Sequence, residues 1–135
     1  MRSKIFIYVA VAAILFGCKK YPDGPTISLR THTERISHTS WMVESANKNG
    51  NDITSTYTGI NYTEAYGKDG TFAYTTSVGG GTGKWSFENS DTQIKRNGVS
   101  GQNSNDLTIL ELKQNAFGYK FIDGNDTYEF RLIPN

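Results

Sequence analysis

A run of glycines that ends in a lysine, GGGTGK at residues 79–84, is the stretch whose residue types most resemble a chemical site. Backbone amides in a glycine-rich loop can bind phosphate, and a lysine after the loop can neutralise it. The phosphate-binding motif of nucleotide hydrolases, however, requires a glycine where this chain has Val78 and a serine or threonine where it has Trp85. The residues that follow favour a strand over the helix that phosphate-binding and dinucleotide-binding motifs need. We therefore predict a flexible hairpin loop at the rim of a barrel, with no nucleotide bound.

Metal binding and acid-base catalysis are the other chemistries to weigh. The two histidines, His32 and His38, are six residues apart, whereas zinc-binding histidines on a helix are usually spaced by four. No motif places a nucleophile beside a base, so a catalytic triad has no support. We expect no enzymatic activity, no metal and no cofactor, and we interpret both histidines as solvated or helix-capping residues.

Carboxylates fall mostly in predicted turns, where an aspartate is used for hydrogen bonds from its side chain to the backbone. The aspartates in these turns are Asp52, Asp69, Asp91, Asp123 and Asp126. Glu64 and Glu129 fall within predicted strands and could point inward, but edge or outer-face positions are favoured for both.

Aromatic residues give the most information about function, since the chain has 8 tyrosines, 7 phenylalanines and 2 tryptophans. Many of them alternate with polar residues in predicted strands, so they should share the inner face of a sheet. Two interpretations stay open: these side chains fill the core, or they line a partly open cavity that holds a hydrophobic ligand. The candidate ligand-binding residues are Trp41, Phe72, Tyr74, Trp85, Phe87, Phe117, Tyr119, Tyr128 and Phe130.

A short helix and a series of strands must position these residues. The spacing of Thr31 and Glu34 is that of a capping box, which predicts a helix over about residues 32–37 with Ile36 facing the core. From Trp41 onward the chain shows only short alternating runs between Gly, Asn and Asp clusters, a pattern typical of antiparallel strands. Residues 53–57 are included among these runs, and no further helix is expected.

Turn residues and alternation set the expected strand boundaries. Trp41, Val43 and Ser45 are expected to share one face, and Asp69-Gly70 predicts a tight hairpin. Val78 is placed at the end of the strand that begins at Phe72, and residues 97–105 are predicted to form a flexible loop. The predicted fold class is all-β, an antiparallel meander of about eight strands that forms a small barrel, with a short N-terminal helix.

The N-terminus carries the features of an export signal. Arg2 and Lys4 precede an apolar run, residues 5–16, which is too short to span a bilayer and has the length of a signal-peptide core. The sequence Leu15-Phe16-Gly17-Cys18 resembles a bacterial lipobox. That resemblance implies cleavage before Cys18 and lipidation of its thiol. Cys18 is the only cysteine in the chain, so an internal disulfide is excluded.

The predicted domains are a lipoprotein signal peptide over residues 1–17, a lipid-anchored tether over 18–30, and a β-barrel domain over 31–135. Cleavage lowers the 14 basic residues to 12 against 13 acidic ones, a net charge of −1. A near-neutral chain lacks the positive field that nucleic-acid binding requires. The residues after Cys18 are lysines rather than an acidic run, which favours the periplasmic face of the outer membrane over the cell surface.

Several short motifs resemble the lipocalin-like domains of Gram-negative bacterial outer-membrane lipoproteins. They are Trp41 after the helix, Asp69-Gly70, Gly83-Lys84-Trp85-Ser86-Phe87, and residues 128–132, and the resemblance covers residues 31–133. It implies a lipocalin-like barrel or half-barrel with an inner cavity. We expect a non-catalytic, membrane-anchored envelope lipoprotein that binds a small apolar or amphipathic ligand. The alternative is a structural or accessory lipoprotein that docks on another envelope protein.

Overall fold

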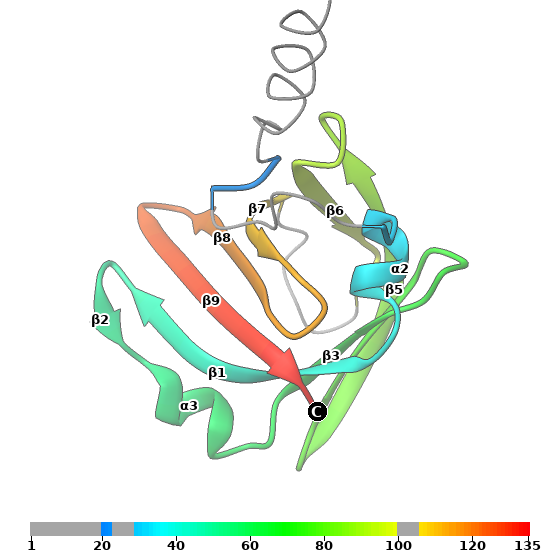
Figure 1. Cartoon of the computed structure of the whole chain (residues 1–135). Coiled ribbons are helices and arrows are strands. Elements are labelled where there is room, and N and C mark those ends of the chain that lie inside the picture. The colour runs from blue at the N-terminus through cyan, green and yellow to red at the C-terminus, as the bar shows by residue number, and fades with distance from the viewer. Residues whose placement is uncertain (1–19, 23–28, 100–105) are drawn as a thin grey trace, which may run out of the picture.

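The computed structural model describes residues 20–22, 29–99 and 106–135. These residues form nine antiparallel strands and two short helices, so the predicted fold class is confirmed. Eight strands follow one another as a meander, and the last pairs with the first to close a barrel, while the short strand β2 adds to the edge of β1. In Figure 1 the red strand β9 lies along the cyan strand β1 where the barrel closes.

The helices are α2 (His32–Ile36) and α3 (Thr54–Thr58). The strands are β1 (Ser40–Lys48), β2 (Asn51–Asp52), β3 (Thr63–Tyr66), β4 (Thr71–Thr76), β5 (Gly79–Glu88), β6 (Gln93–Asn97), β7 (Asp106–Leu112), β8 (Phe117–Asp123) and β9 (Asp126–Pro134). Among the described residues, neither helix is long and apolar enough to cross a bilayer.

The barrel has two ends, because consecutive strands run in opposite directions. One end carries α2 and the β3–β4, β5–β6 and β7–β8 turns, and we call it the α2 end. The other carries α3 and the β1–β2, β4–β5 and β8–β9 turns, and we call it the α3 end.

Helix α2 is confirmed together with its capping box. The Thr31 hydroxyl accepts a hydrogen bond from the Glu34 backbone N–H, and the Glu34 carboxylate accepts one from the Thr31 backbone N–H. Ile36 is fully buried, and its carbonyl accepts a hydrogen bond of 2.8 Å from Trp41 Nε1. Arg35 also donates to the carbonyl of Leu112, at 3.0 Å. These contacts fix α2 to the end of β7 and cover one end of the barrel.

The glycine-rich stretch is a strand, so the prediction of a flexible loop there is wrong. Residues 79–88 form β5, and its glycines pair with β4, with Gly81 opposite Tyr74 and Gly83 opposite Phe72. A Cβ added to Gly83 would lie 2.6 Å from the Asn97 carbonyl oxygen and 2.7 Å from Val99 Cγ2. Glycine therefore allows close approach of neighbouring backbone within the strand.

Val78 lies in the short β4–β5 turn instead of extending the inner face of β4. Its side chain is 88% exposed. Gly79, which follows it, has a φ of 146°, a value that favours glycine. The hairpin is therefore tight, because the glycines that were expected to widen it are paired with β4.

Residues 54–58 form helix α3, which corrects the strand predicted over 53–57. The Asp52 carboxylate accepts a hydrogen bond of 2.8 Å from the Thr54 backbone N–H at the start of the helix. Tyr57 then packs edge-on against Phe130 and Tyr62, with ring centroids 4.8 and 5.5 Å away. A weak alternation of apolar residues also fits one helical turn, and these long-range contacts decide between the two.

A bulge in β1 corrects the expected inner face of that strand. Trp41 and Val43 are buried as predicted, but the register shifts between Val43 and Ser45 where β1 pairs with β9. Ala46 is therefore the next fully buried residue, in place of Ser45. A bulge adds one residue to a strand and so reverses which later side chains face inward.

Asp69 and Asp91 lie in turns as predicted, whereas Asp52, Asp123 and Asp126 are terminal residues of β2, β8 and β9. Gly70 and Gly124 have φ values of 81° and 61° in the β3–β4 and β8–β9 turns. Asn97 ends β6, whereas residues 100–105 of the predicted loop lie outside the described residues, as do Cys18 and the export signal.

Candidate functional site

A cluster of polar side chains lies inside the barrel, around Glu64 of β3. Glu64 is 1% exposed, so its predicted edge or outer-face position is wrong, whereas Glu129 is exposed. The hydroxyls of Tyr62 and Tyr119 donate to Glu64 Oε1 at 2.9 and 2.7 Å, and the Tyr66 hydroxyl donates to Oε2 at 2.7 Å. The carboxylate is thus fixed by three phenols from two strands and the segment before β3.

Arg96 of β6 completes this group, and its role was not foreseen from the sequence. Its NH1 atom donates to Glu64 Oε1 at 3.0 Å, and its side chain is only 5% exposed. The guanidinium also lies over the rings of Phe72 and Tyr119, 4.9 and 5.7 Å from their centroids. Within the described ranges, Arg96 Nε is buried and has no hydrogen-bond acceptor. We call the five residues Tyr62, Glu64, Tyr66, Arg96 and Tyr119 the Glu64 cluster.

The electrostatics of the cluster keep the phenols of Tyr66 and Tyr119 protonated. Burial raises the pKa of Tyr66 and of Tyr119 well above the usual value, and the nearby Glu64 carboxylate raises both further. Each hydroxyl therefore acts as a hydrogen-bond donor to Glu64. A buried ion pair is weak evidence of stabilisation, because apolar residues of similar volume often serve a core at least as well. A polar cluster held in an aromatic barrel is therefore a candidate for function.

Inward-facing positions for Glu64 and Arg96 were indicated by the alternation of inward and outward residues along their strands. Arg96 is two residues from Ile94, which is fully buried. Glu64 lies between Tyr62 and Tyr66 at the same spacing. Alternation alone predicts an inward face for both, but the usual exposure of charged residues argued for the opposite orientation.

Five of the candidate ligand-binding aromatics lie toward the α2 end, and four of them are fully enclosed there. Trp41 and Phe117 pack with centroids 5.8 Å apart, and Trp85 donates from Nε1 to the Gly67 carbonyl at 2.9 Å. Phe72 is 1% exposed, while Phe87 is half-buried beside Trp85. Around this end the aromatics pack against one another and against α2.

Aromatic rings continue from the Glu64 cluster toward the α3 end. Tyr119 stacks on Phe130 with centroids 5.3 Å apart, and Phe121 stacks on Tyr128 at 4.9 Å with an interplanar angle of 8°. Phe121 also lies 6.0 Å from Phe130. We call Tyr119, Phe121, Tyr128 and Phe130 the aromatic stack. Phe121 and Tyr128 are half-buried, so the stack runs from the enclosed interior to the α3 end.

Tyr74 lies beside this end of the barrel, opposite Glu64 in the β3–β4 pairing. Its ring stacks against that of Tyr62 at 5.9 Å, and its side chain is half-buried. Tyr57 and Phe121 belong to the same aromatic surroundings, although neither was among the candidate residues. For Phe121 the alternation with Phe117 and Tyr119 gave the signal, whereas Tyr57 reaches Phe130 only because α3 forms.

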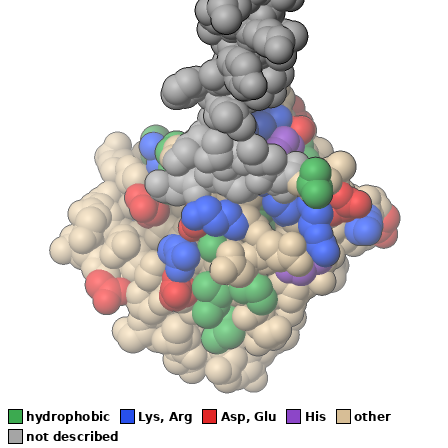
Figure 2. Space-filling model, in the orientation of Figure 1, with side chains coloured by type: hydrophobic (Ala, Val, Ile, Leu, Met, Phe, Trp, Pro, Cys, Tyr) green, Lys and Arg blue, Asp and Glu red, His purple; other side chains and the backbone are tan. Residues whose placement is uncertain are grey.

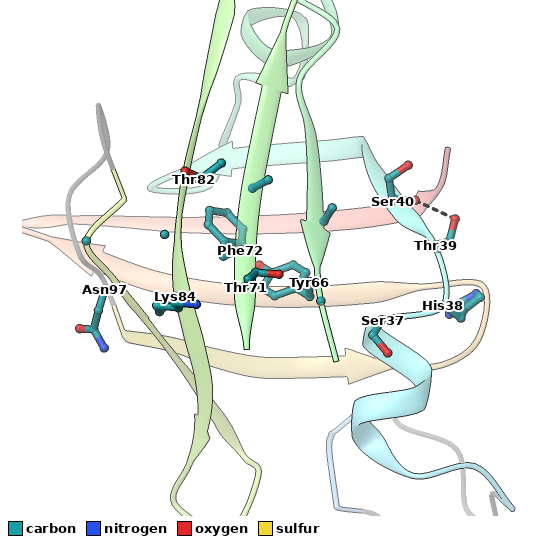
Figure 3. A pocket seen from close by; sticks show the side chains of 15 residues that line it. Ser37, His38, Thr39, Ser40, Tyr66, Thr71, Phe72, Thr82, Lys84 and Asn97 are labelled. Carbon is teal, nitrogen blue, oxygen red and sulfur yellow. Dashed lines mark hydrogen bonds between the residues drawn. The ribbon is translucent and has the colours of Figure 1, made fainter. Parts of the chain in front are cut away.

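A groove of about 710 Å³ lies on the outside of the barrel, across β3, β4 and β5. Ala65, Ala73 and Thr82 pair across these strands and alternate with inward-facing residues, so they form its floor. Figure 3 shows Lys84 and Asn97 on one side of the groove and His38 on the other. The groove shares Tyr66 with the Glu64 cluster and also reaches Phe72 between the strands, whereas Tyr62, Glu64, Arg96 and Tyr119 do not line it.

The two histidines lie apart, at opposite ends of α2. His32 Nδ1 is 2.9 Å from the Asp91 carboxylate, and His38 Nδ1 is 2.6 Å from the Arg35 carbonyl oxygen. In the described part of the chain, no three His, Cys, Asp or Glu side chains come together as metal ligands.

Comparison with known proteins gives no family for this chain. No protein-family model matches it, and a search of curated proteins finds no match. The function must therefore be inferred from the residues of the barrel itself.

Proposed function

We propose that this protein is a non-catalytic envelope lipoprotein whose barrel binds a small amphipathic molecule through the α3 end. The observation that carries the proposal is the buried Nε of Arg96, which has no acceptor among the described residues. A buried donor without a partner is destabilising by about 1–3 kcal/mol. A ligand that supplies the missing acceptor would remove that penalty.

The charge of the Glu64 cluster determines which polar group a ligand can place beside Arg96. Glu64 already neutralises Arg96 at 3.0 Å, so the pair has no net charge. A ligand carboxylate would add an uncompensated negative charge in the interior, which is strongly unfavourable. A carbonyl or hydroxyl oxygen would accept from Nε without that penalty. The proposed ligands are therefore neutral esters, amides, ketones or alcohols with an apolar body.

The aromatic stack supplies the surface for that body. Phe121 and Tyr128 are half-buried at the α3 end, and Phe130 connects them to Tyr119 in the Glu64 cluster. Aromatic faces bury a large apolar area, and tyrosine hydroxyls add polar contacts at the edge. Tyr119 and Phe130 are buried, so a ligand that enters from the α3 end would have to displace rings of this stack before its oxygen reaches Arg96.

Membrane attachment through Cys18 is part of the proposal. The apolar run of residues 5–16 and the lipobox before Cys18 support export and lipidation. We place the mature protein on the outer membrane, at its periplasmic face, because lysines rather than acidic residues follow Cys18.

Binding of a matched pair of ligands tests the proposed site. The unlipidated mature chain carrying Cys18→Ser would be titrated calorimetrically with a long-chain fatty acid and with its methyl ester. Arg96→Lys keeps the positive charge beside Glu64 but lacks the Nε–H group. A charge-assisted hydrogen bond contributes about 1.5–3 kcal/mol, so ester binding should weaken about 10- to 100-fold in this variant.

Arg131→Lys is the matched control, since Arg131 is exposed on β9 and should leave the affinity unchanged. Unfolding midpoints of both variants show whether the barrel is intact. Native mass spectrometry of protein extracted from membranes adds a search for a ligand that co-purifies. The methyl ester should bind more tightly than the fatty acid, and the proposal fails if the ester does not bind and no small molecule co-purifies.

An accessory role on another envelope protein is the alternative proposal, and the outer groove is the surface that favours it. Its floor of Ala65 and Ala73 leaves about 710 Å³ open across three strands. Ala73→Arg would fill this floor from the outer face of β4. Crosslinking in membranes should recover one stoichiometric partner with the native chain and lose it with this variant, whereas recovery of the partner by both chains excludes the groove.

A further inference from the structure

The segment directly after the predicted lipidation site is attached to the barrel through Tyr21. Tyr21 is 2% exposed and belongs to the hydrophobic core. Its hydroxyl donates to the Asp91 carbonyl at 2.9 Å, and its ring meets the ring of His32 edge-on at 5.5 Å. Burial raises the pKa of Tyr21, so the hydroxyl remains a donor. A buried tyrosine with this hydrogen bond is a defined contact of the tether region.

Asp91, whose carbonyl accepts from Tyr21, also contacts Lys20 and His32 through its carboxylate. Its carboxylate lies 3.4 Å from Lys20 Nζ and 2.9 Å from His32 Nδ1. Asn89, Ser90 and Asp91 have successive φ values of 48°, 55° and 62°, a left-handed conformation that non-glycine residues rarely adopt. Such a turn persists only when its surroundings hold it. Figure 1 shows the blue segment Lys20–Pro22 next to the tip of this β5–β6 hairpin.

The length of chain between the anchor and this contact is short. Cys18 precedes Tyr21 by three residues, and three residues span at most about 11 Å when fully extended. Strand β8, with 7 residues, covers about 23 Å at the usual rise of a strand. The α2 end therefore lies within reach of the anchor, and the α3 end does not.

The distribution of charge agrees with this arrangement. The β1–β2 and β8–β9 connections at the α3 end contain or adjoin Asp52, Asp123 and Asp126, against Lys48. An anionic lipid surface repels such an acidic end and attracts nearby lysines and arginines. Exposed basic residues on the segments of the α2 end are Lys20, Arg30 and Lys68, with Lys113 half-buried and Arg35 of α2 buried. They are interspersed with Glu34, Asp69, Glu88 and Asp91, and Figure 2 likewise shows both signs mixed over the visible face.

We propose that the Tyr21 contact orients the barrel on its own membrane, with the α2 end against the lipid headgroups and the α3 end facing away. This inference rests on the lipid anchor at Cys18 that is part of the proposed function. In this orientation the aromatic stack opens toward the aqueous side. A ligand would therefore be exchanged with a soluble carrier or another protein and not taken directly from the underlying bilayer.

Energy transfer from two labelled positions to acceptor dyes on lipid headgroups tests the orientation. Asn115 in the β7–β8 turn lies at the α2 end and Val78 in the β4–β5 turn lies at the α3 end, and both are exposed. Each would be replaced by cysteine in the full chain, processed in cells and reconstituted into phosphatidylethanolamine–phosphatidylglycerol vesicles. The Cys18 thiol carries the lipid, so the donor dye labels only the introduced cysteine.

Energy transfer to the lipid dyes should be higher from a donor at position 115 than from a donor at position 78. Tyr21→Ala combined with Asp91→Ala should reduce this difference, because the tether no longer holds one end, while the exposed substitution Lys120→Ala should preserve it. Circular dichroism reports whether each variant keeps its strands. Equal transfer from both positions overturns the orientation, and a difference that survives the double substitution overturns the role of Tyr21.

The intact mass of the processed protein separates the two proposals. Absence of acyl chains on Cys18 removes the anchor and the orientation together. An acylated protein with equal transfer from both positions removes only the orientation and leaves the proposed function in place.

Discussion

The Glu64 carboxylate and the Arg96 guanidinium lie 3.0 Å apart inside the barrel, although they are 32 residues apart in the chain. Glu64 comes from β3 and Arg96 from β6, so β4 and β5 separate their strands in the sheet. The side chains therefore meet across the interior of the closed barrel. Their pairing depends on the curvature of the sheet and links strands that share no backbone hydrogen bonds.

Glu64→Ala should strongly destabilise the barrel. It leaves the Arg96 charge buried without its carboxylate and removes the acceptor of three tyrosine hydroxyls. Breaking a buried ion pair from one side typically lowers the free energy of unfolding by about 3–5 kcal/mol. Urea unfolding followed by far-ultraviolet circular dichroism measures the loss, and Glu129→Ala, on an exposed side chain, should change it by less than about 0.5 kcal/mol.

A double substitution tests whether the unpaired Arg96 charge causes the loss of stability. Glu64→Leu with Arg96→Leu removes both charges at once and should recover part of the stability lost by Glu64→Ala, since apolar residues can replace a buried pair. A loss below about 1 kcal/mol for Glu64→Ala would contradict the buried charge described here, as surface substitutions have effects of that size.

Gly83→Ala should destabilise β5 even though alanine is normally the better residue within a strand. Alanine gains about 0.5–1 kcal/mol over glycine from backbone entropy. The added Cβ would, however, lie 2.6 Å from the Asn97 carbonyl oxygen and 3.0 Å from the Val99 backbone nitrogen. Overpacking typically lowers the free energy of unfolding by about 1–3 kcal/mol, so the clash outweighs the entropy.

Ser86→Ala serves as the control for Gly83→Ala, because Ser86 is exposed on the same strand. Chemical denaturation gives both free energies of unfolding. Equal or higher stability of Gly83→Ala would mean that the end of β6 moves away readily and that glycine is not required in the strand.

The Asp91 contacts should weaken in acid. Hydrogen bonds from His32, and then from Lys20, lower the pKa of Asp91 in the folded protein. The folded state therefore holds the carboxylate proton less tightly than the unfolded chain, whose aspartates titrate near pH 3.9. The stability that Asp91 contributes is fully present above about pH 4 and is lost as the pH falls through the lowered pKa.

Unfolding measurements on the native chain and on Asp91→Asn detect this dependence. The difference in the free energy of unfolding between them should be constant from about pH 6 to about pH 4 and decrease below that range. A difference that grows in acid would show that the carboxylate is not the form that binds Lys20 and His32.

Cys18→Ala should release the protein from the membrane fraction of a Gram-negative host. Each methylene of an acyl chain contributes about 0.8 kcal/mol to membrane binding, and several chains anchor a protein stably. Fractionation and immunoblotting of the native chain and the variant measure the distribution between membrane and soluble fractions. Membrane retention of the variant would exclude lipidation as the main attachment.

Local sequence patterns were sufficient for most of the secondary structure. The capping box of Thr31 and Glu34 predicted α2, and glycines at turns marked the β3–β4 and β8–β9 hairpins. The errors occurred where a long-range contact overrode a local pattern. Gly83 belongs to a strand because of its neighbours on β4 and β6, and Tyr57 belongs to a helix because its ring reaches Phe130.

The sequence by itself determined an all-β meander, its turns and the inner face of most strands, because alternation and turn residues act over a few neighbouring positions. Only the tertiary structure decided that Glu64 and Arg96 meet in the interior and that Tyr21 is buried against the β5–β6 turn. Side chains from distant strands become neighbours when the sheet closes. Charged residues can then replace hydration with mutual hydrogen bonds, a compensation that no local pattern contains.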